Sequence, residues 1–227
     1  MVAGMVIFPG LTQLDLTGPY EVFVRLPGME VLLIAENEHV VKSDHGLLLT
    51  PDTTFDKAPQ VDILFVPGGN GVFGAMQNKK LLMFLRQQSA EAKYITSVCT
   101  GALVLAAAGL LDGYKATTHW LSLNLLGMFN VDVLEERVVA DRNRITGGGV
   151  TAGIDFGLHV AAALFGEIKA KEVQLMMEYN PEPPFNAGSP KTANEEIVKN
   201  VIGSRRNIQA EREALIKKML ADRLGGL

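Results

Sequence analysis

The chain has 227 residues, of which 48% are hydrophobic and 20% are charged, and it carries a net charge of -4 with a pI near 5.6. This composition supports a substantial core and excludes intrinsic disorder. The acidic balance argues against nucleic acid as the main partner, because phosphate binding requires a concentrated basic surface. We therefore expect a small molecule or a protein as the partner.

Cys99 is the single cysteine, so the chain has no internal disulfide. Residues 1–8 are apolar but show no basic leader and no small-residue cleavage site. No stretch approaches the roughly 20 apolar residues that span a bilayer. These features predict a cytoplasmic protein with no membrane partner, and a reduced compartment also suits a working thiol.

Short apolar runs alternate with helix-like segments, and we expect strands at residues 2–8, 30–35, 61–66 and 94–98. This alternation predicts an α/β fold with a mostly parallel sheet flanked by helices on both faces. The Thr17-Gly18-Pro19 sequence favours a helix start, with the helix over residues 20–26. Asp15 would then lie in the loop that follows the first strand.

Two later segments look like antiparallel additions to the sheet, at residues 47–55 and 137–145, the second turning at residues 141–144. Residues 151–165 are apolar on nearly all sides, which predicts a buried helix.

The end of the chain differs in composition from the rest. Residues 180–190 include four prolines, which exclude a helix or a central strand and leave a linker or an extended, semi-rigid arm. Residues 192–224 are charged and helical in character. We predict one α/β domain over residues 1–180, followed at 181–227 by the proline-rich arm and C-terminal helices at a dimer interface.

Cys99 lies where the strand-like run 94–98 gives way to a small-residue, helix-like run. A turn of this kind holds its central side chain over the end of a sheet, beside the first N–H groups of the helix. The helix dipole there favours the thiolate, and cysteines so placed can have a pKa several units below the free value of about 8.5, although the sequence alone does not give the pKa of Cys99. Cys99 is therefore a candidate nucleophile, and the alternative is a small buried hydrophobe.

Three loops are expected to converge beyond the carboxyl ends of the strands, where open α/β sheets bind ligands. They carry Asp15, the glycine-rich turn 67–71 and Cys99. The N–H groups of this turn can approach a ligand without side-chain obstruction and, with the N–H of Thr100, can form an anion-stabilising pocket. The alternative is an ordinary tight turn.

The polar side chains near this site each allow two interpretations. Asp15, which is flanked by leucines, is either a proton donor with a raised pKa or a helix cap. Thr100 either donates to a reacting group or caps the following helix. His119 is either the partner of Cys99 in a dyad or a structural residue beside Trp120. The remaining histidines lack metal-site spacing, so no metal is predicted.

Three consecutive glycines, residues 147–149, precede the predicted buried helix. They allow the backbone to pass close to another element. They also allow that helix to shift when the cysteine changes charge, which unaffected turnover in Gly148→Ala would exclude.

Five ordered motifs together resemble the ThiJ/PfpI superfamily, which has a glutamine-amidotransferase-like α/β fold with a cysteine at the nucleophile elbow. The motifs are LDLTGP at 14–19, VPGG at 66–69, SVCTG at 97–101, ATTHW at 116–120 and TAGID at 151–155. The resemblance covers residues 1–178. Within the superfamily the chain is most similar to members that hydrate isocyanides, and residues 183–190 extend the likeness past the common core.

The resemblance implies hydration of an isocyanide, R–N≡C, to an N-formamide with no cofactor. Cys99 would add to the terminal carbon, Asp15 would supply a proton and then activate water, and the resulting thioimidate would be hydrolysed. Thr100 and the N–H of Gly69 would position the reacting atoms. The family is commonly homodimeric, which implies a homodimer here. The substrate-binding residues expected on this basis are Gly68, Gly69, His119 and Trp120.

At three positions the sequence differs from other members of the superfamily, and these differences argue against their activities here. Peptidase-type members carry a histidine directly after the nucleophile, where this chain has Thr100. Many relatives use glutamate where this chain has Asp15. Amidotransferase elbows have a glycine two residues before the cysteine, where this chain has Ser97.

A different class of function also fits part of the pattern. Ligand-sensing domains fused to AraC-type regulators share the Asp15, Cys99 and His119 neighbourhoods. Such regulators continue into a helix-turn-helix domain of roughly 100 residues, and the segment after Pro190 is too short and too weakly basic to be one. A stand-alone domain that senses a small molecule without catalysis therefore remains the alternative.

Overall fold

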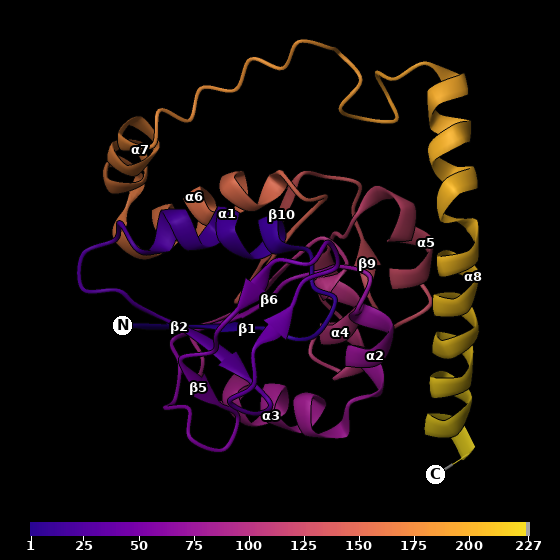
Figure 1. Cartoon of the computed structure of the whole chain (residues 1–227), viewed down its shortest axis with the longest axis horizontal. Coiled ribbons are helices and arrows are strands. Elements are labelled where there is room, and N and C mark those ends of the chain that lie inside the picture. The colour runs from indigo at the N-terminus through magenta and orange to yellow at the C-terminus, as the bar shows by residue number, and fades with distance from the viewer. Residues whose placement is uncertain (226–227) are drawn as a thin grey trace.

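The computed structural model describes residues 1–225, and its centre is a seven-stranded sheet (Figure 1). The strand order is β10-β11-β7-β6-β1-β2-β5, and every neighbouring pair is parallel except β10 and β11. The strands are β1 (Val2–Val6), β2 (Glu30–Ala35), β5 (Thr53–Thr54), β6 (Ile63–Val66), β7 (Tyr94–Val98), β10 (Val138–Asp141) and β11 (Arg144–Gly147). The predicted mostly parallel α/β fold is confirmed.

Helices cover both faces of this sheet, as Figure 1 shows. One face carries α1 (Gln13–Phe23), α6 (Ala152–Phe165) and α7 (Glu167–Met176), and the other carries α2 (Val72–Gln77), α3 (Lys79–Ser89) and α4 (Gly101–Ala107). Beside them lie η1 (Trp120–Ser122), α5 (Leu123–Leu126) and the long α8 (Glu195–Gly225). Two short ribbons complete the fold, β3 (Val41–Lys42) with β4 (Leu48–Leu49) and β8 (Lys115–Ala116) with β9 (Asp132–Val133).

The central strands are apolar because both faces of the sheet are covered. All four residues of β6 are buried, and β7 is buried from Ile95 to Val98. Under α1 and α6 the rings of Phe65 and Phe156 lie 5.6 Å apart, and those of Phe23 and Phe156 lie 6.3 Å apart. A parallel sheet buried on both faces requires such continuous apolar strands.

Helix α1 begins earlier than predicted, at Gln13, so Asp15 lies in its first turn and not in a loop. Pro19 stands inside the helix, where its missing N–H leaves the carbonyl of Asp15 without the usual donor four residues later. The predicted helix start at Pro19 was wrong. Proline prefers the first turn of a helix, but the packing of α1 against α6, where Pro19 meets Gly153, outweighs that local preference.

The two predicted antiparallel additions had different outcomes. In the segment 47–55, β4 pairs with β3 antiparallel, but β5 extends the main sheet in parallel with β2. In the segment 137–145, β10 and β11 form the predicted hairpin, and β11 also joins β7 in parallel. The first prediction was thus only partly right. Strands of two residues are too short for a pattern of apolar and polar residues to indicate how they pair.

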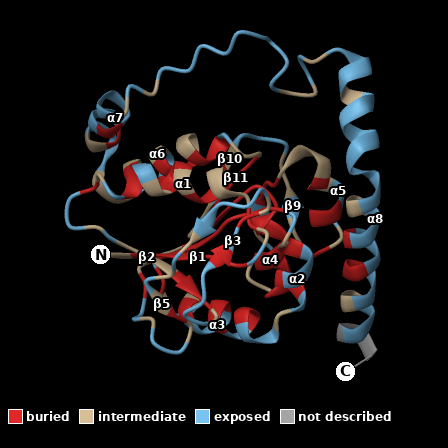
Figure 2. Ribbon diagram, in the orientation of Figure 1, coloured by how far each residue is buried: buried red, intermediate tan, exposed pale blue. Residues whose placement is uncertain are grey.

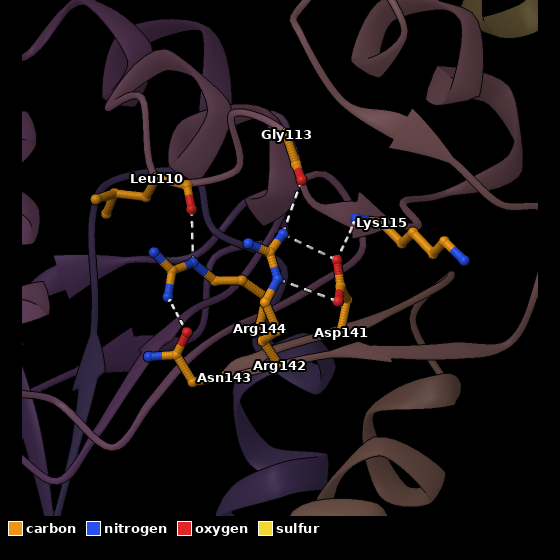
Figure 3. Close-up of polar contacts among 7 residues, drawn as sticks. All are labelled: Leu110, Gly113, Lys115, Asp141, Arg142, Asn143 and Arg144. Atoms are coloured by element: carbon orange, nitrogen blue, oxygen red, sulfur yellow. Dashed lines mark hydrogen bonds and ion pairs between the residues drawn. The ribbon is translucent and has the colours of Figure 1, made fainter.

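The turn of the β10–β11 hairpin is held by a cluster of charged side chains (Figure 3). Arg142 has a positive φ of 54° and donates from Nη2 to the carbonyl of Gly113 at 2.7 Å. Arg144 donates from Nε to the carbonyl of Leu110 at 2.6 Å. Asp141 accepts from the N–H of Lys115 at 2.9 Å. These bonds fix the outer end of β11 and thus the strand that runs beside β7.

The predicted buried helix is α6, and one of its faces is exposed. Phe156 and Val160 are buried, whereas His159 and Ala163 are exposed. Because the outer face of α6 also carries small apolar side chains, the sequence did not show which face of the helix is buried.

The last part of the chain leaves the core and returns to it. Residues 177–194 contain neither helix nor strand, as predicted for the arm. Figure 2 shows that α8 is exposed along its first half and partly buried along its second half, where Arg212, Leu215 and Ile216 face the core. Within residues 1–225, no helix is both long and apolar enough to cross a membrane.

Candidate active site

Cys99 occupies the predicted turn between β7 and α4, in a left-handed backbone conformation with φ of 55°. Its N–H donates to the carbonyls of Gly147 and Gly148 at 3.0 and 2.7 Å. Its carbonyl accepts from Oγ1 of Thr118 at 2.7 Å. A non-glycine residue at positive φ is strained and persists only where its surroundings hold it. These three bonds hold the elbow and fix the direction of the thiol.

The three segments expected to converge do meet at this elbow, with Asp15 coming from the first turn of α1 and not from a loop. The N–H of Gly68 donates to Oδ2 of Asp15 at 2.9 Å, and the N–H of Gly69 donates to Oγ1 of Thr100 at 3.1 Å. The Cys99 thiol and the Asp15 carboxyl lie close enough to shift each other's pKa. A Cβ on Gly68 would lie 2.5 Å from the Thr100 nitrogen, so only glycine permits this approach. The turn thus orients the acid and the hydroxyl around the sulfur.

The electrostatics of Cys99 and Asp15 are set by burial. Burial raises the pKa of Asp15 to about 7, against contacts with Cys99 and Gly68 that lower it. Burial and then the charge of Asp15 also raise the pKa of the Cys99 thiol above its usual value. Desolvation of a thiolate therefore outweighs the lowering of the pKa that the first turn of a short helix allows. The two groups therefore share a proton near neutral pH.

Thr100 does not cap α4, although capping was the simpler interpretation. Its side chain makes no cap hydrogen bond to α4 and faces the glycine turn, where its Oγ1 accepts from Gly69. Thr100 also hydrogen-bonds to the sulfur through its side chain and its backbone N–H, and both contacts lower the thiol pKa. It is therefore well placed to contact an atom bonded to that sulfur.

His119 lies in the wall of the same cavity as Cys99. Burial, then the charges of Arg212 and Arg205, lower the pKa of His119 to about 4, so the imidazole is neutral near pH 7. Its Nδ1 accepts from the N–H of Leu121 at 3.3 Å, and its ring stacks with Trp120 at 6.0 Å. Because the thiol and Asp15 influence each other's pKa, the acid, and not His119, is the better partner for the thiol proton.

The elbow opens into a cavity of about 170 Å³. Its walls come from the sheet edge (Thr12, Gly69, Cys99 and Thr100), from the loop between β3 and β4 (Asp44 and His45), and from α8 (Arg205, Ile208, Gln209 and Arg212). A neighbouring cavity of about 370 Å³ is lined by Trp120 and the end of the arm, and His119 and Val150 border both cavities. Trp120 therefore lies beside the elbow cavity and not in it.

The contribution of α8 was missed in the sequence. Arg212 is 5% exposed and donates from Nη2 to the carbonyl of Gly69 at 2.7 Å. Gln209 exchanges hydrogen bonds with Ser122 of η1. A signal was present: Ile208, Arg212 and Leu215 recur at helical spacing, which places a charged residue on the apolar stripe of the helix.

Comparison with known proteins gives a consistent result. The profile of the DJ-1/PfpI family matches residues 2–163. The chain is 50% identical to isonitrile hydratase of Pseudomonas putida, over 86% of either chain. The crystal structure of a ThiJ/PfpI family protein from Pseudomonas syringae superposes with a TM-score of 0.93 at 45% identity, covering 95% of this chain and 90% of that one. The chain is 32% identical to the transcriptional regulator GbdR of Pseudomonas aeruginosa. The aligned residues cover 78% of this chain and 50% of GbdR.

Proposed function

The chain belongs to the DJ-1/PfpI family, and on that premise we propose that it is a cysteine-dependent enzyme that hydrates isocyanides to N-formamides. The observation that carries this function is the pair of Cys99 and Asp15 at the elbow, which influence each other's pKa, in a chain 50% identical to an isonitrile hydratase. The substrate is a small molecule, which agrees with the size of the cavity beside the sulfur.

In the first step Cys99 adds to the terminal carbon of R–N≡C. The pair of Cys99 and Asp15 starts with one shared proton, so a thiolate can form while Asp15 holds that proton. A new S–C bond forms as the proton passes from Asp15 to the same carbon. The product is a thioimidate, S–CH=N–R, and Asp15 is left as a carboxylate. A pKa of about 7 suits Asp15 both to give and to regain a proton at neutral pH.

In the second step the thioimidate is hydrolysed. The Asp15 carboxylate takes a proton from water as the oxygen bonds to the carbon, and that proton passes to the nitrogen. Collapse of S–CH(OH)–NH–R returns the hydroxyl proton to Asp15, breaks the C–S bond and releases H–CO–NH–R. The pair then again holds one proton, and no cofactor enters the balance.

Thr100, Gly68 and Gly69 support this chemistry by their positions. The N–H groups of the two glycines are engaged by Asp15 and Thr100, so their effect is to orient these side chains. The hydroxyl of Thr100 lies beside the sulfur and positions the nitrogen of the bound substrate. We assign His119 and Trp120 to the pocket that receives the R group, since His119 borders both cavities and Trp120 borders the larger.

The second candidate function is ligand sensing, because the chain is also similar to the transcriptional regulator GbdR. That similarity is 32% sequence identity over half of the regulator, which is weaker than the 50% identity over most of a hydratase. Turnover separates the two functions. Purified protein is mixed with an aromatic isocyanide, and formamide is followed by mass spectrometry beside Cys99→Ala. We expect formamide from the wild type only. Binding of the isocyanide without formamide would support the sensing domain.

We also propose a cytoplasmic homodimer in which residues 181–227 contribute to the interface. The exposed apolar side chains of α8, Ile197, Val201 and Ile202, together with Phe185 of the arm, support a partner there. A single free thiol that must stay reduced supports the compartment. Light scattering that gives the mass of one chain would contradict the dimer.

A further inference from the structure

Helix α8 forms one side of the cavity at Cys99 and brings a buried cation to it. The Arg212 side chain is 5% exposed, and its Nη2 donates to the Gly69 carbonyl at 2.7 Å. Its Nε is also buried and has no hydrogen-bond partner among the described residues. The ion pairs found within residues 1–225 do not include Arg212. A buried and unneutralised guanidinium is costly, which indicates a role other than stability.

The contact with Gly69 connects Arg212 to both side chains that flank the sulfur. Gly69 has a positive φ of 131°, and its own N–H holds Oγ1 of Thr100. The preceding N–H, of Gly68, holds Asp15. The Gly69 carbonyl also accepts from Oγ1 of Thr100 at 3.5 Å. It lies in the peptide unit that follows the two N–H groups, so a guanidinium that fixes it restrains the turn next to the units that orient the acid and the hydroxyl.

We propose that Arg212 is a positioning residue of the Cys99 site: it holds the glycine turn in its working geometry, and its positive charge stabilises the thiolate during attack. This inference rests on the proposed hydration for its kinetic part only. It assigns to the C-terminal helix, which lies beyond the matched residues 2–163, a part in the reaction.

The other charges around the sulfur leave this role to Arg212. Asp44 is acidic and opposes a thiolate, Asp15 is neutral while it holds the proton of the thiol, and His119 is neutral near pH 7 because its pKa is lowered to about 4. Arg205 lines the cavity from an exposed position, where water weakens its charge. Besides Cys99, the titratable and charged groups that line the cavity are Asp44, His45, His119, Arg205 and Arg212, and Asp15 is buried beside the thiol without lining the cavity.

The test uses the fact that Cys99 is the only cysteine, so alkylation of the whole protein by iodoacetamide reports one thiol. Arg212→Met keeps much of the volume and removes the charge, and Arg212→Lys keeps the charge but loses the planar fork. Arg206→Met is the matched control, since Arg206 is exposed on the same helix. Alkylation rates are measured from pH 6 to pH 10, with kcat and KM for an aromatic isocyanide.

For Arg212→Met we expect alkylation at pH 8 to slow about tenfold and its rise with pH to move up by about one unit. For Arg212→Lys we expect alkylation within about threefold of wild type but a kcat about tenfold lower, because the bond to Gly69 is lost. Arg206→Met should leave both measurements unchanged.

The proposal is overturned if both Arg212 variants keep wild-type alkylation and kcat, or if Arg206→Met shows the same losses. If Arg212→Met does not fold, as judged by circular dichroism, an unchanged kcat in Arg212→Lys overturns it. Absence of formamide from the wild type would refute the hydration instead, while the alkylation profiles would still decide the role of Arg212.

Discussion

Two of the walls of the cavity at Cys99, the sheet edge and α8, are built in different ways. The wall at the sheet edge consists of loops joined to buried parallel strands, and its backbone N–H groups are matched to Asp15 and Thr100. The wall formed by α8 arrives after an extended arm, and it brings in Arg212 with an unpartnered Nε. The difference indicates that the sheet edge holds the reacting groups, whereas the helix sets their environment.

The largest expected effect comes from the sheet-edge wall. Asp15→Asn should lower kcat by about 100- to 10,000-fold, since a general acid and base is lost while the shape is kept. In the wild type kcat/KM should rise as the pH rises through about 7, where the pair of Cys99 and Asp15 loses its first proton. The pH profile of the residual Asp15→Asn activity should lack that rise. An unchanged profile would remove Asp15 from the proton transfers.

The same substitution has a consequence for stability. Because burial raises the pKa of Asp15 from 3.8 to about 7, folded protein keeps a proton that the unfolded chain releases, and stability falls as the pH rises from about 4 to about 7. Asp15→Asn removes this contribution, which amounts to at most about 4 kcal/mol at about 1.4 kcal/mol per unit. Urea unfolding of both proteins at pH 5 and pH 8 measures it. The gain from Asp15→Asn should be larger at pH 8.

The next effect tests the attachment of the α8 wall. Ile216 is fully buried, and Ile216→Ala should lower the free energy of unfolding by about 2 to 4 kcal/mol. Urea denaturation measures this loss. Ile202→Ala in the exposed half of the same helix is the control and should change stability by less than about 0.5 kcal/mol in the monomeric chain. Equal losses from both variants would mean that α8 is held along its whole length.

A smaller effect is expected from the glycine turn. Gly68→Ala places a Cβ 2.5 Å from the Thr100 nitrogen, so the turn must shift at a cost of about 1 to 3 kcal/mol. Gly74→Ala in α2 has open space around it and should instead stabilise the protein by up to about 1 kcal/mol. Thermal unfolding compares the two. A stable Gly68→Ala with full activity would show that the close approach is not needed.

The smallest effect concerns the polar contact between α8 and η1. Gln209→Ala removes the hydrogen bonds with Ser122 and should cost about 1 kcal/mol. Ser122→Ala and the double variant complete a cycle, and the double variant should cost no more than about the larger single loss. Additive losses would show that the two side chains act on different parts of the protein.

The two walls also differ in how far the sequence could predict them. The sheet-edge wall depends on patterns that are local in the chain: the apolar run before Cys99, the small residues after it and the glycines after β6. These patterns placed the three segments together, although the start of α1 was wrong, because tertiary packing overrode a local preference for proline at a helix start. For Thr100 the local sequence left a helix cap and a contact with the reacting group open, and its side chain makes no cap hydrogen bond.

The pKa of Cys99 could not be predicted from the turn alone. The helix dipole is visible in the sequence, but the burial of the thiol and the distance to Asp15 depend on how the whole sheet is covered. The contact of Arg212 with Gly69 joins residues 143 positions apart, and no local pattern gives the path of the arm between them. The sequence could show only that Arg212 lies on an apolar stripe.

The arm at residues 177–194 joins α7 to α8 and so tethers α8 to the domain. The length of the arm affects the effective concentration of α8 at the cavity. A covalent link of this kind keeps a segment near its binding surface at an effective concentration that a free segment would have to match. A chain cleaved within the arm would need α8 as a free peptide at a comparable concentration to rebuild the cavity. Proteolysis at Pro190 would leave every recognisable motif of the family intact and still open Cys99 to bulk solvent.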